Sequence, residues 1–254
     1  MVSEEHIKPL SDKERKVISS LRLAKKRREE GLFVAEGVKS IELLLPAFRL
    51  RWLVYPETFQ VPFDCPSTLC RIATDRELSK LSSLDSRQEV MAVFEIPAPA
   101  DPSELDFGGL AVGLDQLQNP GNLGTIIRLC DWLGIKSILC SEGTVDVYNP
   151  KTVQASMGAL GHVHVYQGID LPSFLPRHFG SIITTAMEGS DFRDLKGLKD
   201  SNTIVIFGNE GNGISEAVRR IATTQVTIPK AEGAVSDSLN VSLSAAILLS
   251  SLIY

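Results

Sequence analysis

Short apolar runs alternate along the chain with stretches that have the periodicity of an amphipathic helix. In the first 95 residues the apolar runs predict strands at 31–37, 52–55 and 90–94, and helices are predicted at 38–45 and 75–81. Further along, apolar runs predict strands at 110–114, 137–140, 163–166, 181–186, 203–207 and 225–228. Strands that alternate with helices in this way are typical of α/β folds.

A linker composition separates the two halves of this pattern. Residues 96–109 contain three prolines and end in the pair Gly108-Gly109. We therefore expect a small α/β domain at 1–95, a linker at 96–109 and a larger α/β domain at 110–254.

Three helical stretches of the second domain refine the picture. A helix predicted from residue 122 or 123 to Leu133, closed by Gly134, buries a stripe of Ile126, Ile127, Cys130 and Leu133. Arg128 falls on its opposite face and points away from the core. Asn122 either caps this helix or belongs to a site. Residues 149–161 predict another helix, rich in small residues. The helix at 241–253 is apolar on more than one face, which favours a self-complementary interface.

A glycine-rich loop follows the strand at 203–207. Its sequence, GNEGNG at 208–213, allows the backbone to turn sharply and to approach a ligand closely. The strand at 225–228 stops at Pro229, and a second polar loop then leads into the last helix. Two strands thus end in polar loops at the edge where open α/β sheets bind ligands.

Composition limits the class of protein. A hydrophobic content of 43% and a charged content of 22% are ordinary for a globular protein. No apolar run approaches the roughly 20 residues that a membrane span needs, and the N-terminus resembles no signal peptide. A cytoplasmic protein is therefore expected. Cys65, Cys70, Cys130 and Cys140 lack metal-ligand spacing, which favours buried free thiols over a disulfide or a metal site.

Charge is distributed unevenly along the chain. Residues 1–30 hold nine Lys or Arg against six Asp or Glu, a net of +3, whereas residues 101–254 hold ten against sixteen, a net of −6. The most basic point is the run Lys25, Lys26, Arg27 and Arg28. A solvated helix face would explain this run in most proteins. If nucleic acid binds, however, this run is the basic patch that attracts it.

Three motifs carry a family resemblance. The sequences NPGNLGTIIR at 119–128, GNEGNG at 208–213, and IP at 228–229 with SLNV at 238–241 resemble the signature motifs of the SpoU/TrmH family. That family comprises RNA 2′-O-ribose methyltransferases of the SPOUT superfamily. The resemblance implies a C-terminal SPOUT domain with a parallel sheet and a deep trefoil knot. The sequences FVAEG at 33–37 and QEVMAV at 88–93 resemble the edges of the family's substrate-binding domain, similar in fold to ribosomal protein L30e.

The resemblance also implies the chemistry. S-adenosyl-L-methionine would donate a methyl group to a ribose 2′-OH of structured RNA, ribosomal RNA of the 23S type before transfer RNA, in a homodimeric enzyme without a metal. The matching catalytic positions are Asn122, Arg128, Glu210, Ser238 and Asn240. The pKa of a guanidinium is so high that the group stays protonated at neutral pH, and a protonated group does not readily act as a base. We therefore expect Arg128 to clamp the phosphate and stabilise the alkoxide, and base catalysis stays open.

The positions expected to contact the cofactor are Thr184, Ala186, Gly208, Asn209, Gly211, Ile228, Ser238 and Leu239. Two features depart from the family pattern. Lys230 stands where Met is common, and the loop at 230–237 is longer than the compact form. Both bear on substrate choice and on the fine shape of the pocket more than on the reaction.

Two other functional classes compete with this interpretation. A non-catalytic RNA-binding or ribosome-assembly factor would keep the fold, but the five catalytic positions are intact. A dinucleotide-dependent oxidoreductase is disfavoured because no G-x-G-x-x-G follows a strand in the required context.

Overall fold

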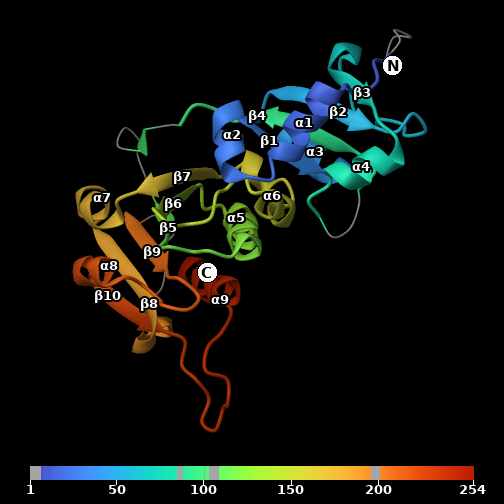
Figure 1. Cartoon of the computed structure of the whole chain (residues 1–254). Coiled ribbons are helices and arrows are strands. Elements are labelled where there is room, and N and C mark those ends of the chain that lie inside the picture. Colours follow the sequence, from blue (N-terminus) through green and yellow to red (C-terminus); the bar gives the residue numbers. More distant parts are fainter. Residues whose placement is uncertain (1–6, 85–87, 100, 103–108, 196–200) are drawn as a thin grey trace. The chain divides into compact units, whose positions relative to one another are not determined.

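The computed structural model describes residues 7–84, 88–99, 101–102, 109–195 and 201–254. The chain divides into two compact units, which are described separately below (Figure 1). Unit 1 comprises Met1–Ala98 and Tyr148–His162, and unit 2 comprises Pro99–Val147 and Val163–Tyr254. Among the described residues, no helix is long and apolar enough to cross a membrane.

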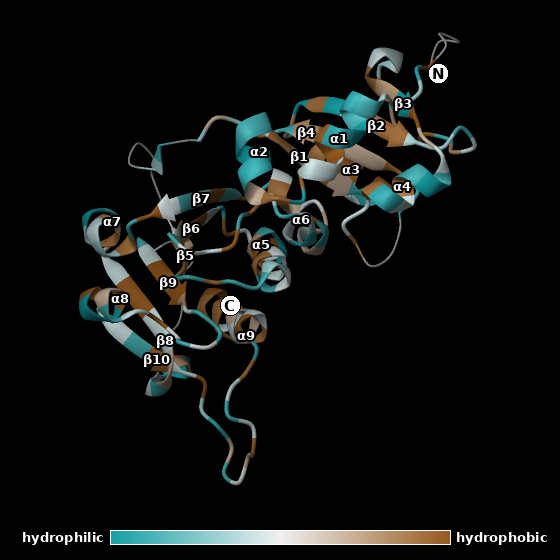
Figure 2. Ribbon diagram, viewed as in Figure 1, coloured by the Kyte–Doolittle hydropathy of each residue, from teal (hydrophilic) through white to brown (hydrophobic). Residues whose placement is uncertain are grey.

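Unit 1 is built on a mixed four-stranded sheet. The strands are β1 (Leu32–Glu36), β2 (Leu50–Tyr55), β3 (Cys70–Ile72) and β4 (Met91–Glu95), in the order β1-β4-β2-β3. Strand β4 runs antiparallel to β1 and β2, and β3 runs parallel to β2. The helices are α1 (Asp12–Ser20), α2 (Ala24–Glu30), α3 (Val38–Leu44) and α4 (Asp75–Leu81). Figure 2 shows α1, α2 and α4 as largely hydrophilic, as expected of helices that turn one face to water.

The charged stretch at 11–30 forms the two helices α1 and α2. Ser11 and Glu14 form a capping box that starts α1. The Arg27 guanidinium donates to the carbonyl oxygens of Leu21, at 2.8 Å, and Arg22, at 3.1 Å. These carbonyls lie where α1 has ended and would otherwise lack helical partners. Arg27 is therefore 1% exposed, a buried structural residue within the basic run.

A segment from the second half of the sequence belongs to unit 1. The helix α6 (Pro150–Ser156) and the turn at Ala159–Gly161 replace the single helix predicted at 149–161. Met157 and Gly158 interrupt that helix because both have left-handed backbone conformations, with φ of 51° and 88°. Gly158 also allows close packing, since a Cβ there would lie 2.5 Å from the Leu43 Cβ. Tyr148 packs on Phe33 with ring centroids 4.9 Å apart.

Unit 2 is built on a six-stranded parallel sheet, in agreement with the predicted fold class. The strand order is β10-β8-β9-β5-β6-β7. The strands are β5 (Leu110–Leu114), β6 (Ser137–Ser141), β7 (His164–Ile169), β8 (Ser181–Asp191), β9 (Thr203–Phe207) and β10 (Thr224–Thr227). The helices are α5 (Pro120–Leu133), α7 (Leu171–His178), α8 (Glu216–Ile221) and α9 (Val241–Ile253). The central strands β5 and β9 are buried along their whole length, as expected of a sheet covered on both faces.

Helix α5 buries the predicted stripe and ends where the sequence predicted. Ile126, Ile127 and Cys130 are fully buried, and Gly134 closes the helix in the left-handed conformation. All four cysteines are buried and free.

Candidate active site

The first two motif loops leave the neighbouring strands β5 and β9 at one edge of the parallel sheet. Strands β5 and β9 pair in parallel register from Leu110↔Thr203 to Leu114↔Phe207, so their C-terminal ends coincide. The next residue after β5 is Asp115, which is 2% exposed. Its carboxylate accepts a hydrogen bond from the Ser215 N–H at 2.7 Å. This buried carboxylate therefore ties the end of β5 to the residue that precedes α8.

Helix α5 begins two or three residues earlier than its apolar pattern predicts. Asn119 is the N-cap, and its Oδ1 accepts from the N–H groups of Gly121, at 2.8 Å, and Asn122, at 3.2 Å. Pro120 occupies the first turn, where its missing N–H does no harm. The interpretation of Asn122 as the helix cap is therefore wrong, and the Asn122 side chain is free for another role.

That role is a chain of side-chain hydrogen bonds through all the motif loops. Asn122 is 8% exposed, and its Nδ2 donates to Glu210 Oε1 at 3.0 Å. Its Oδ1 accepts from Asn240 Nδ2, also at 3.0 Å. Asn240 in turn caps α9, because its Oδ1 accepts from the Ser242 N–H at 2.9 Å. Three residues that are 88 and 118 positions apart in sequence thus form one network.

Glu210 is the anionic end of this network. Besides Asn122, its carboxylate accepts from the backbone N–H groups of Gln118, at 3.4 Å, and Asn119, at 3.2 Å. Burial would raise the pKa of Glu210, but the hydrogen bonds from Asn122 and from the backbone outweigh it and lower the pKa from its ordinary value of 4.5. Glu210 is consequently a carboxylate at neutral pH whose donors come from the α5 loop.

The other two predicted catalytic residues lie outside the network. Arg128 is exposed on the outer face of α5, as predicted, and makes no hydrogen bond or ion pair with the residues that the structure describes. All its donors are therefore available to a ligand. Ser238 lies in the exposed loop before α9 and lines the cavity described below.

The glycine-rich loop is shaped by close backbone approach. A Cβ on Gly208 would lie 2.3 Å from the Gly213 carbonyl carbon, so only glycine fits. Asn209 Oδ1 accepts from the N–H groups of Gly211, at 2.9 Å, and Asn212, at 3.0 Å. Asn209 Nδ2 donates to the Gln116 carbonyl oxygen at 2.8 Å. Gly208 and Asn209 therefore shape the loop and join it to the β5 side.

A cavity of about 360 Å³ opens in unit 2 between the ends of β8 and β10 and the loop before α9. Of the residues expected to contact a cofactor, Ala186, Ile228, Ser238 and Leu239 line it. Gly208, Asn209 and Gly211 are not among its lining residues. The volume lies within the range of about 300–1,000 Å³ that is usual for small-molecule sites.

Thr184 also lies away from this cavity. It is 1% exposed, and its Oγ1 faces the Thr224 carbonyl oxygen at 3.5 Å. The three residues that follow it, Thr185, Ala186 and Met187, line the cavity instead. The strand-end pattern did not reveal at which residue β8 reaches the cavity.

Twelve further residues line the cavity, beyond those expected to contact the cofactor. They are Thr185, Met187, Val226, Thr227, Pro229, Lys230, Ala231, Ala234, Ser236, Asp237, Ser244 and Leu248. Half of them belong to the long loop between β10 and α9, which extends well away from the sheet (Figure 1). The sequence indicated this part of the lining through Lys230 and the unusual length of the loop at 230–237, whereas no sequence signal pointed to the lining residues of β8, β10 and α9.

The basic run lies in unit 1, on α2. Lys25 and Arg28 are exposed and Lys26 is half-buried, whereas Arg27 faces the interior. Lys26 Nζ lies 2.6 Å from Glu29 Oε2 and Lys25 Nζ lies 3.8 Å from Glu29 Oε1. Surface ion pairs of this kind are weak, so another anion can replace the glutamate as the partner of these lysines.

Comparison with known proteins extends over both units. Residues 109–250 match the model of the SpoU rRNA Methylase family. A 23S rRNA (guanosine(2553)-2′-O)-methyltransferase of Bacillus subtilis is 28% identical over 236 residues, which cover 90% of this chain and 91% of the relative. A TrmH-family structure from Porphyromonas gingivalis is 33% identical, with a TM-score of 0.84 and coverage of 96% and 98%. The SpoU methyltransferase AviRb from Streptomyces viridochromogenes, solved with AdoMet, is 25% identical, with a TM-score of 0.82 and coverage of 96% and 97%.

Proposed function

Because the chain belongs to the SpoU rRNA Methylase family, we propose that it transfers a methyl group from S-adenosylmethionine to a ribose 2′-OH of 23S-type ribosomal RNA. One observation carries this proposal: Glu210, Asn122 and Asn240, one from each motif, are hydrogen-bonded in a single network. This network fixes the start of α5, the helix that presents the Arg128 guanidinium, which has no partner among the described residues. The reaction would take place in the cytoplasm, where a bacterial ribosome is assembled.

The cavity of unit 2 suits the cofactor. Ile228, Leu239 and Leu248 offer apolar surface for an adenosine, while Thr227, Ser238 and Asp237 offer polar groups. When bound, S-adenosylmethionine supplies the electrophilic methyl group. The residues of this chain bind and orient the reactants and keep water away from them.

We assign Arg128 to the target nucleotide. Its exposed guanidinium is permanently charged and presents a planar set of donors that matches a phosphate. The same charge stabilises the alkoxide as the 2′-oxygen attacks. Glu210 and Asn122 hold the start of α5, the helix that carries Arg128, and Asn240 extends this support to α9.

Two further assignments complete the proposal. Unit 1 captures the RNA, with Lys25, Lys26 and Arg28 as its cationic contacts. The enzyme is a homodimer that pairs through α9, because Leu243 and Ile247 remain 58% and 42% exposed on that helix. Exposed leucine and isoleucine four residues apart form an apolar stripe, which favours a helix-mediated interface.

The test compares RNA from cells with and without this protein. Mapping 2′-O-methylation should reveal a site in the large-subunit ribosomal RNA that disappears with the protein and returns on complementation. Calorimetry should detect binding of S-adenosylmethionine to the purified chain. A methylation map that is the same in both cells would refute the proposal, and cofactor binding alone would not rescue it.

A further inference from the structure

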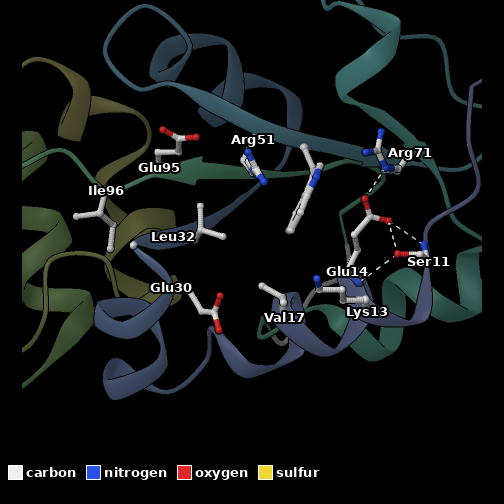
Figure 3. A pocket seen from close by; sticks show the side chains of 12 residues that line it. Ser11, Lys13, Glu14, Val17, Glu30, Leu32, Arg51, Arg71, Glu95 and Ile96 are labelled. Atoms are coloured by element: carbon white, nitrogen blue, oxygen red, sulfur yellow. Dashed lines mark hydrogen bonds and ion pairs between the residues drawn. The ribbon is translucent and has the colours of Figure 1, made fainter.

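Unit 1 contains a cleft that the proposed reaction does not use. Its volume is about 650 Å³, and it opens beside α1 on the sheet face that this helix covers (Figure 3). Charged and polar side chains make up most of its lining, and Val17, Leu32, Trp52 and Ile96 supply the apolar part. A mostly polar lining that includes an aromatic side chain offers contacts to a ligand that carries both a charge and an aromatic ring.

In one ion pair of the cleft, both oxygens of the carboxylate accept hydrogen bonds, whereas the guanidinium keeps donors without an acceptor in the described chain. Glu14 Oε1 accepts from Arg71 Nε at 2.7 Å, and Oε2 accepts from the Ser11 N–H at 2.9 Å and hydroxyl at 2.7 Å. Arg71 Nη1 donates to the carbonyl oxygens of Thr68, at 2.9 Å, and Cys70, at 2.8 Å. Within the described residues, Arg71 Nη2 has no acceptor, although the side chain is only 15% exposed. A largely buried guanidinium edge thus retains free donors beside the cleft.

Two more cations lie at the cleft without a carboxylate partner among the described residues. They are Lys13 and Arg51, both exposed. The Arg51 guanidinium lies over the Trp52 ring, 5.5 Å from its centroid. Glu95 is 3.5 Å from Arg49, which offsets its charge. In Figure 3, Lys13 and Arg71 lie on one side of the view, Glu30 and Glu95 lie on the other, and Arg51 lies between them.

We propose that this cleft binds one unpaired nucleotide of the RNA substrate. The base stacks on the Trp52 indole in place of the Arg51 guanidinium, and its phosphate is held by Lys13, by the displaced Arg51 and by the free Nη2 of Arg71. Indole rings stack on any base, and guanidinium groups bind phosphate through paired N–H donors. Glu30, which can only accept hydrogen bonds, favours a base with an amino group over uracil.

This inference rests on the proposed function, because it takes RNA as the ligand, but it concerns a different part of the chain. The cleft lies in unit 1, whereas the hydrogen-bonded network and the cavity lie in unit 2. It is also distinct from the basic run on α2, none of whose four residues lines the cleft.

The chain has only two tryptophans, so Trp132→Phe leaves Trp52 as the single fluorescent indole. In this background, hexaadenylate should quench Trp52 fluorescence with a saturable curve. Arg51→Ala should raise the Kd for hexaadenylate at least about fivefold, because it removes a phosphate contact and a cation beside the stacked base. Arg76→Ala is the matched control, since Arg76 is an exposed cation of α4 that does not line the cleft. Hexauridylate should bind more weakly than hexaadenylate.

The outcomes separate the two proposals. The cleft assignment is wrong if hexaadenylate leaves Trp52 fluorescence unchanged, or if Arg51→Ala and Arg76→Ala have equal effects. Adenosine monophosphate that binds as tightly as hexaadenylate would also overturn it, because the site would then serve a free nucleotide. Methyl transfer by the wild-type chain with an unresponsive Trp52 refutes the cleft alone. Saturable, Arg51-dependent quenching in a chain without methyl transfer refutes the proposed function alone.

Discussion

Arg128 and Glu210 are both charged residues of the motif loops, but the fold uses them in opposite ways. Glu210 accepts three hydrogen bonds from the α5 region. Arg128 has no hydrogen bond or ion pair with the described part of the chain and is exposed. A side chain that stability does not require, presented on a rigid helix beside an ordered network, is suited to contact a substrate.

Replacement of Arg128 by Ala should therefore abolish activity without loosening the fold. We expect methyl transfer to fall by about 100-fold or more, the scale for loss of one preorganised charged donor at a developing oxyanion. Cofactor affinity and the melting temperature should be unchanged, because Arg128 does not line the cavity. Methyl-transfer assays, calorimetry and thermal melts measure the three quantities. Lost cofactor binding in a folded Arg128→Ala variant would assign this residue to the cofactor instead.

Glu210 should contribute to stability in a pH-dependent way. Its pKa is lowered in the folded chain, so its contribution is complete above the ordinary value of 4.5 and is lost as the pH falls through the folded pKa. Glu210→Gln should reduce the free energy of unfolding at pH 7 by about 1 kcal/mol or more, because charge-assisted hydrogen bonds are lost.

Urea unfolding of both proteins from pH 7 to pH 3 tests this expectation. The difference between wild type and Glu210→Gln should stay constant down to about pH 5 and then shrink, because Glu210 itself becomes protonated. Other carboxylates titrate in the same range, but they do so in both proteins. A difference that grows on acidification would contradict the assigned direction of the shift.

At the scale of elements, the glycine-rich loop allows a matched pair of substitutions. Gly208→Ala would place a Cβ within 2.5 Å of backbone atoms of Gly213 and Ile214, which cannot move aside easily. Gly211→Ala would meet only the Asn209 Oδ1, at an ordinary 3.5 Å. We expect Gly208→Ala to lower the free energy of unfolding by about 1–3 kcal/mol, as overpacked sites do. Gly211→Ala should stay within about 0.5 kcal/mol. Chemical denaturation distinguishes them, and equal effects would show that the loop adapts.

At the scale of the whole molecule, α9 should decide the oligomeric state. Ala245, Leu248, Leu249 and Leu252 are buried in unit 2, which leaves Leu243 and Ile247 without cover in the described chain. The double substitution of Leu243 and Ile247 by Glu should convert a dimer into a monomer, because two charges per helix would have to be desolvated in the interface. Light scattering at micromolar concentration is the measurement. Val235→Glu alters an exposed apolar residue outside α9 and should leave the dimer intact. A wild-type chain that is already monomeric would refute the interface.

Capture of RNA by the basic run is a second property of the whole molecule. Simultaneous replacement of Lys25, Lys26 and Arg28 by Ala should weaken RNA binding and flatten its salt dependence. Each lost phosphate contact should lower the slope of log K against log salt by about 0.7–0.9. Arg76→Ala with Lys80→Ala is the control, since both are exposed cations of unit 1 away from α2. An unchanged slope in the triple variant would show that the basic run does not bind the RNA phosphates. Arg27 is omitted because its loss would leave the carbonyl oxygens of Leu21 and Arg22 unsatisfied.

Much of this protein is determined by the sequence alone, because periodicity and turn chemistry are local properties. Apolar runs place the strands, the stripe through Ile126 and Cys130 orients α5, and Gly134 ends it. The motifs identify the family because they occur together and in order. The trefoil knot that the resemblance implies stays a prediction.

Only the tertiary structure decided which partners those residues have. Asn122 is no helix cap, because Asn119 lies at the true start of α5 and the fold brings Glu210 and Asn240 to its side chain. Arg27 belongs to the core of unit 1 rather than to an RNA surface, because the end of α1 presents carbonyl groups that require donors. Residues 148–162 belong to unit 1, since Gly158 fits against Leu43, more than a hundred positions earlier. Contacts between residues so far apart depend on how the chain closes in space, and no local pattern records them.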